Sequence, residues 1–123
     1  MKRVFDREIY SISISGHNML CASFEVIKII DFWKHDVLGV LSWNDDYFCD
    51  TPNCAHLIGY NDWFIAGSGT GSILYGEHTL TKLKVINTIS ASQKGIFSII
   101  PSSFYDQSFL SIDKSGIASF WSI

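Results

Sequence analysis

The chain has 123 residues, a formal charge of −3 and 47% hydrophobic residues, so it has room for one packed domain, residues 1–123, and is too apolar to be disordered. Only 17% of the residues are charged, which excludes a polybasic nucleic-acid arm and an acidic tail. The nine Lys and Arg residues are scattered without a cluster, so no nucleic-acid partner is expected.

Short apolar runs, many alternating with period two, dominate the chain and predict an all-β fold. Tyr10, Ile12 and Ile14 alternate with serines, for example, and the turn formers Asn, Asp and Gly separate many of the runs. No stretch of a dozen residues shows a clean apolar stripe at helical spacing. In chain order, the expected strands are residues 3–5, 9–14, 20–23, 26–30, 38–41, 55–58, 63–67, 72–75, 83–86, 96–100, 109–112 and 117–121.

An internal repeat links these strands. Residues 64–77 align with residues 109–122 at an offset of 45 without a gap, and residues 26–31 align with 72–77. A period near 45 residues with four short strands is typical of a propeller blade. The expected repeats run approximately over residues 2–36, 37–80 and 81–123.

The repeats resemble the WD-repeat family of β-propellers. The family's third strand ends in Trp-Asp after an Asp-Gly turn, and the last repeat runs from Asp113 to Trp121 in the same pattern. The earlier copies keep the terminal acid as Asp31 and Glu77 but lack the Trp. The family's Gly-His pair is missing from all three copies, so its His-Ser-Asp-Trp hydrogen-bond network is not carried over. The resemblance implies a propeller that binds other proteins.

The strand count predicts a partial propeller of three four-stranded antiparallel blades, the last lacking its outer strand. Closed propellers need about four to eight blades. Three blades therefore leave two faces that a neighbouring blade should cover. Three arrangements remain open: a six-bladed ring of two copies, with residues 3–5 completing the partner's third blade; missing blades supplied by a partner; or a piece of a longer propeller.

The cysteines indicate a reducing compartment. Cys21, Cys49 and Cys54 are an odd number, which does not suit a disulfide framework. The first residues lack the apolar core of a signal peptide, and no run approaches the ~20 apolar residues of a membrane span. An intracellular protein, cytoplasmic or nuclear and without a membrane partner, is expected.

Two stretches resemble sites of chemistry but have simpler interpretations. Residues 67–72 are rich in glycine but lack the Lys-Ser/Thr ending of a phosphate loop, so a hairpin turn is expected. Cys49, Cys54 and His56 could bind zinc with a distant fourth ligand such as His35. Buried thiols without a metal are the preferred interpretation, and no cofactor is expected.

No residue pattern indicates catalysis, because no serine lies in a Gly-X-Ser-X-Gly elbow. A non-enzymatic scaffold that binds partner proteins through a rim of loops is therefore the leading hypothesis. The acidic loop at residues 44–47 is flanked by aromatic residues and could bind a basic peptide. These aromatic side chains could instead pack into the core. The candidate partner-binding residues are Phe24, Trp43, Asp45, Asp46, Tyr47 and Lys114. The alternative function is a structural subunit or propeller fragment whose blade faces complete a larger assembly or a homodimeric ring.

Overall fold

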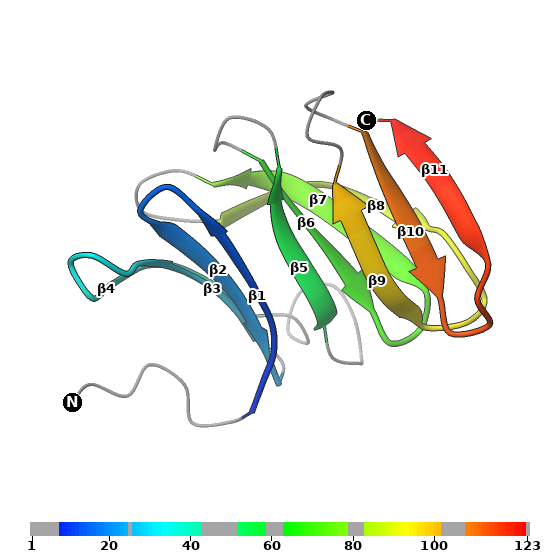
Figure 1. Cartoon of the computed structure of the whole chain (residues 1–123), viewed down its shortest axis with the longest axis horizontal. Helices are drawn as coiled ribbons and strands as arrows, with labels where there is room; N and C mark the ends of the chain where they lie inside the picture. Colours follow the sequence, from blue (N-terminus) through cyan, green and yellow to red (C-terminus); the bar gives the residue numbers. More distant parts are fainter. Residues whose placement is uncertain are drawn as a thin grey trace.

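The computed structural model describes residues 8–24, 26–42, 52–58, 63–78, 83–101 and 108–122. Within these ranges the chain forms eleven strands and no helix, and nothing in them could cross a membrane as a helix. The strands belong to three antiparallel sheets, each a meander of strands consecutive in sequence. Figure 1 shows the sheets fanning out side by side in chain order.

Each sheet is one blade, and its strands run outward in sequence order. The first blade contains β1 (Ile9–Ser15), β2 (Asn18–Ser23), β3 (Val26–Asp31) and β4 (Asp36–Ser42). The second contains β5 (Pro52–Ile58), β6 (Trp63–Ser68), β7 (Ser72–His78) and β8 (Leu83–Ser90). The third contains β9 (Ile96–Pro101), β10 (Ser108–Asp113) and β11 (Ala118–Ser122). Strands β1, β5 and β9 lie next to one another as the inner strands (Figure 1).

This arrangement confirms the expected all-β partial propeller, in which the third blade has three strands within the described part of the chain. The expected outer strand at residues 3–5 lies outside the described residues. Most of the strands are longer than the alternation predicts. For example, β5 begins at Pro52 instead of residue 55, and β8 continues to Ser90 instead of residue 86. A proline is compatible with the first position of a strand, because that position can dispense with a ladder hydrogen bond.

The first and second blades are joined by an aliphatic core. Alternation places Leu20 and Ala22 on one side of β2, and Ile27 and Ile29 on the same side of β3. These side chains are fully buried against the second blade, where Phe64 is the largest member of the cluster. Burying one such aliphatic side chain contributes roughly 1.5–3 kcal/mol, so this contact is a principal source of stability. The second-blade members are Ala55, Phe64, Ala66, Leu74 and Leu83.

Serine hydroxyls reinforce this junction next to the inner strands. Ser11 Oγ accepts a hydrogen bond from Ala55 N at 3.1 Å and lies 3.2 Å from Ala55 O, to which it donates. Ser13 Oγ accepts from Leu57 N at 3.0 Å. Strand β5 pairs with β6 along one edge only, so these serines satisfy backbone groups on its other edge.

The second and third blades are joined by a core that is richer in aromatic residues. Ile65 and Ile73 of the second blade are buried against Ile96, Ile99 and Phe109 of the third. Trp63, Tyr75 and Trp121 pack around this cluster, and the Phe109 and Trp121 rings stack with centroids 6.4 Å apart. The same chain geometry thus accommodates two different sets of side chains.

In both junctions, one face of a blade packs against the opposite face of the blade that follows it in the sequence. The face of a blade that packs on the next blade is its forward face, and the opposite face is its rear face. Forward faces carry Leu20 in the first blade and Ile65 in the second, whereas rear faces carry Phe64 in the second and Phe109 in the third. Within the described chain, the first blade's rear face and the third blade's forward face therefore have no neighbouring blade.

Candidate partner-binding rim

The hairpin turns β2–β3, β6–β7 and β10–β11 lie at the same end of their blades, the lower edge in Figure 1. Phe24 occupies the first of these turns and is half-buried, and Lys114 occupies the last and is exposed. The structure therefore places these two candidate residues on one rim. The other four, Trp43, Asp45, Asp46 and Tyr47, lie outside the described residues and remain predictions.

The part of the rim around the third blade is built from three segments that are hydrogen-bonded to one another. Gly71 O accepts from Ala91 N and Ser92 N, both at 3.0 Å, which joins the β6–β7 turn to the loop before β9. Lys114 N donates to Gly95 O at 2.8 Å, which joins that loop to the β10–β11 turn. Residues 69–71, 91–95 and 113–117 together form the lysine rim.

Glycines make this close packing possible. Gly71 has a φ of 99°, which L side chains rarely adopt, and a Cβ there would collide with Ser92 O. The turn at residues 67–72 is thus confirmed as a hairpin turn, with β6 ending at Ser68 and β7 beginning at Ser72.

The carboxylate of Asp113 is the organising group of the lysine rim. It accepts from Ser92 Oγ at 2.7 Å, so it holds the loop before β9. It also accepts from Ser115 Oγ at 2.6 Å, from Ser115 N at 2.9 Å and from Ile117 N at 3.0 Å. Because the hydroxyls of Ser115 and Ser92 stabilise the charged form, they lower the pKa of Asp113 to about 2. The turn is therefore fixed from inside, while Lys114 stays exposed.

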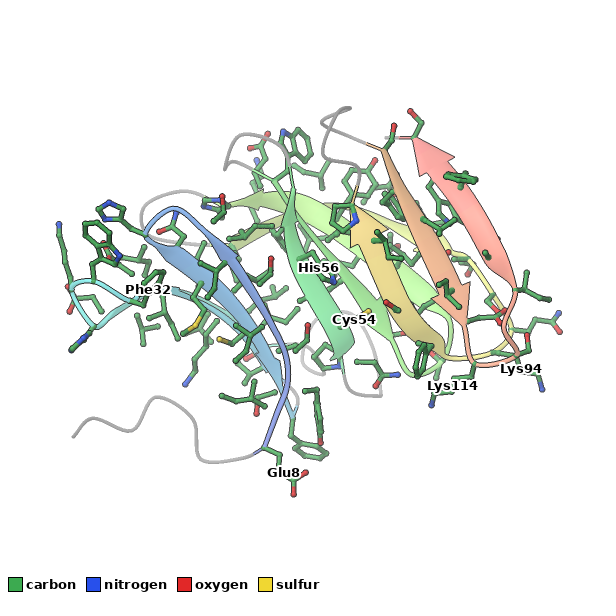
Figure 2. All side chains as sticks on the ribbon, viewed as in Figure 1. Glu8, Phe32, Cys54, His56, Lys94 and Lys114 are labelled. Carbon is green, nitrogen blue, oxygen red and sulfur yellow. The ribbon has the colours of Figure 1, made fainter. Side chains whose placement is uncertain are left out.

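Two lysines supply the positive charge on the exposed surface of this rim. Lys94 and Lys114 are both exposed, and Figure 2 shows them at neighbouring turns at the lower end of the third blade. Ile117 beside them has 63% of its surface exposed. Such a surface can bind a carboxylate while its apolar part contacts a side chain of the partner.

Serines occupy the position of Asp113 in the other two blades. Ser23 Oγ donates to Glu8 O at 2.6 Å and so anchors the chain just before β1. Ser68 Oγ accepts from Ser72 N at 3.0 Å and closes its own hairpin. A polar side chain at this position therefore fixes the rim in all three blades, with different partners.

A second hydrogen bond distinguishes the third blade. Trp121 Nε1 donates to Ser111 Oγ at 2.8 Å. The repeat alignment places Ala66 and Gly76 at these positions in the second blade, and Cys21 and Ile30 in the first. The hydroxyl is thus absent wherever the Trp is absent. The third blade combines this hydrogen bond with the one between Asp113 and Ser92.

Sequence reasoning missed an aromatic stack at the opposite end of the first blade. His17, in the β1–β2 turn, stacks on Trp33, in the β3–β4 turn, with ring centroids 3.9 Å apart. Phe32 N donates to His17 O at 3.1 Å, and Asp31 Oδ1 accepts from Trp33 N and Lys34 N, both at 3.1 Å. An Asp side chain that accepts a hydrogen bond from the backbone two residues later is a recognised turn signal. The β3–β4 turn could therefore have been predicted from Asp31. The pairing of His17 with Trp33 was not, because it joins two hairpins.

The zinc hypothesis gains no further ligand from the described residues. Cys54 and His56 are two apart on β5 and share a side of the strand, as Figure 2 shows along β5. His35 lies in the β3–β4 turn of the first blade, and Cys49 lies outside the described residues. The described part of the chain holds no group of three or more His, Cys, Asp or Glu side chains suited to a metal.

Burial shifts the titration of these side chains toward their neutral forms. It raises the pKa of the Cys54 thiol to about 11, even though a hydrogen bond from the Gly67 backbone acts in the opposite direction. It raises the pKa of Cys21 to about 11 as well, and it lowers the pKa of His56. Neutral buried thiols are unreactive, which suits a structural role.

Known structures share this fold, although the sequence comparisons find nothing. One chain in the crystal structure of a mitotic checkpoint complex matches with a TM-score of 0.80 at 6% sequence identity. The match covers 96% of this chain and 37% of that chain, so the present chain spans well under half of its length. No protein-family model and no curated protein matches the sequence. At this identity the likeness concerns the fold alone.

Proposed function

We propose that this propeller arc is a non-catalytic protein-interaction module of the WD-repeat type, and that its lysine rim binds a partner protein. The observation that carries this function is the hydrogen-bonded assembly of three turns around Asp113, which supports the exposed Lys94 and Lys114. A rim that is ordered before binding loses little conformational entropy when a partner docks.

The partner that suits this rim is a protein segment with carboxylate groups. Two exposed lysines on hydrogen-bonded neighbouring loops attract such a segment and increase its association rate, and the exposed Ile117 adds apolar contact. Phe24 lies in the corresponding turn of the first blade, at the same end of the propeller arc. The loop with Trp43, Asp45, Asp46 and Tyr47 would add a contact of opposite charge for basic side chains.

An intracellular location, cytoplasmic or nuclear, accompanies this function. It is supported by the odd number of cysteines and by the burial of Cys21 and Cys54 as free thiols. A role without catalysis is supported by the sequence, which lacks a recognisable nucleophile motif. Other proteins are the proposed partners.

The test is a pull-down with tagged protein from a lysate of the source cells, followed by titration of a recovered partner at two salt concentrations. The double variant Lys94→Glu/Lys114→Glu should weaken binding by about tenfold or more and reverse its salt dependence. Lys84→Glu on β8 is the matched control, because Lys84 is exposed and lies outside the rim.

Unchanged binding by the double variant would exclude the lysine rim as the partner site. Trp43→Ala and Asp46→Ala then test the acidic loop in the same assay. Loss of binding in these variants alone would move the partner site to that loop.

A further inference from the structure

The first blade's rear face has no neighbouring blade within the described residues, and its strands carry two largely apolar rows. Strand register places Ile12, Cys21, Lys28 and Val40 in one row across β1 to β4. It places Ile14, Met19, Ile30 and Val37 in the next. The members on β1 and β4 are exposed, to 53% for Ile12, 62% for Ile14 and 52% for Val40, whereas Cys21 and Ile30 between them are buried.

The third blade's forward face is uncovered as well. Ile100, Leu110 and Phe120 form one row across β9, β10 and β11, and Ser98, Ile112 and Ala118 form the row beside it. Phe120 has 87% of its surface exposed and Ile100 has 51%. Aromatic and aliphatic side chains that are aligned and exposed in this way mark an interaction surface.

Comparison with equivalent positions in the other blades indicates which surface the third blade's forward face could contact. Leu110 occupies the position of Leu20 and Ile65, and both of these are fully buried under the rear face of the following blade. Phe120 occupies the position of Tyr75, which packs in the second junction. The third blade's forward face therefore has apolar residues where a forward face receives the next rear face.

The first blade's rear face matches in the same way. Met19 occupies the position of Phe64 and Phe109, which fill the rear sides of the two junctions. Ile30 occupies the position of Trp121, which packs in the second junction. One chain thus carries both halves of a third junction, on its two outermost blades.

A polar detail supports this pairing. Ser11 binds the backbone of Ala55 across the first junction. Register places Ser98 at the position of Ser11, and Ile12 at the position of Ala55. A third junction would therefore bring Ser98 Oγ to the free edge of β1 at Ile12.

We propose that the third blade's forward face docks on the first blade's rear face of a second copy of this chain. The contact is head-to-tail and pairs two different surfaces, so each copy keeps one open face and the two copies together leave one more pair of such faces. With three blades in the described part of each chain, two copies bring the total to six, within the range of about four to eight at which propellers close. Two identical junctions then cover all four open faces. A second copy of this chain fits these faces because it supplies both complementary surfaces, including Ser98 and the edge of β1.

Light scattering with size-exclusion chromatography measures the mass directly. The wild-type chain should elute at twice its 13.9 kDa mass at micromolar concentration. Phe120→Asp changes the forward face, and Ile12→Asp changes the rear face. Each alone should weaken the dimer by about 100-fold, because each places an unpaired charge in both junctions. Both side chains are exposed in the single chain, so circular dichroism should show that both variants stay folded.

Mixing the two variants gives the decisive result. A mixed dimer has one junction with both substitutions and one with neither, so dimer should reappear in the mixture but not in either variant alone. Ile86→Asp is the control, because Ile86 is exposed to 45% on β8 of the middle blade, which has neighbours on both faces. This variant should keep the wild-type mass.

A wild-type chain that stays monomeric at 100 µM, or forms species larger than a dimer, would overturn the ring. A dimer that survives Phe120→Asp, or a mixture that stays monomeric, would overturn the head-to-tail pairing. The result is independent of partner binding at the lysine rim, since Lys94→Glu/Lys114→Glu should leave the mass unchanged.

Discussion

The rear faces of the first and third blades occupy equivalent positions in the repeat, but only one of them is covered within the chain. In the third blade Phe109 is 1% exposed under the second blade, and Trp121 is tied to Ser111. In the first blade the equivalent of Phe109 is Met19, which stays partly exposed. The strand pairing at these positions is equivalent, so the difference lies in the side chains and in what covers them.

This comparison shows that the fold of a blade does not require this hydrogen bond. Cys21 and Ile30 in the first blade stand where Ser111 and Trp121 stand in the third. Both partners of the bond have changed to apolar groups, so no buried hydroxyl is left without a partner. Replacing both partners together is close to neutral, whereas losing one is costly.

The largest expected effect comes from the covered residue. Phe109→Ala should lower the free energy of unfolding by about 3–5 kcal/mol, because it opens a cavity in the aromatic core. Met19→Ala at the equivalent position should cost less than about 1 kcal/mol when measured on dilute monomer. Urea denaturation followed by circular dichroism measures both.

Phe97→Ala is the matched control for Phe109→Ala, because Phe97 lies in the same blade with 69% of its surface exposed. It should change stability by less than about 1 kcal/mol. Equal losses in all three variants would contradict the distinction between covered and open faces.

A smaller effect tests the polar pair. Trp121→Phe removes the Nε1 donor and leaves the buried hydroxyl of Ser111 without this partner, which should cost about 1–3 kcal/mol. Adding Ser111→Ala should recover part of that loss, as the substitutions in the first blade suggest. Thermal unfolding of the wild type, the two single variants and the double variant gives the coupling energy of the Trp121–Ser111 pair. Strict additivity would contradict the role of the bond.

The last prediction concerns how the stabilising effect of Asp113 depends on pH. The pKa of this carboxyl falls from an ordinary 3.8 to about 2 in the folded chain. Its stabilising contribution is therefore complete above pH 3.8 and is lost as the pH falls toward 2. Asp113→Asn cannot titrate, so the stability difference between wild type and variant should shrink across that interval. A constant difference between pH 5 and pH 2 would contradict this role.

Much of the fold could be predicted from local patterns in the sequence. Alternation at Tyr10, Ile12 and Ile14 identifies β1, and the repeat at 45 residues identifies the blades. The boundaries were harder to predict. Strand β8 continues through the polar Asn87 and Thr88, because its backbone is held by β7 whatever its side chains contact.

Only those residues of the candidate site that lie in hairpin turns could be predicted from the sequence. Phe24 and Lys114 lie on one rim because equivalent turns lie at the same end of their blades. Lys94 and Ser92 were missed, because their loop joins the rim through Gly71 and Asp113, which are distant in sequence. Nonlocal contacts of this kind leave no pattern in a single sequence.

The strict meander of each sheet has a consequence for how the chain folds. Every ladder joins strands that follow one another, so a blade can assemble from contacts close in sequence. The links between blades, such as Ser11 to Ala55, span 44 residues and carry a larger loop-closure entropy. Hairpins should therefore form first, and the docking of finished blades should set the folding rate.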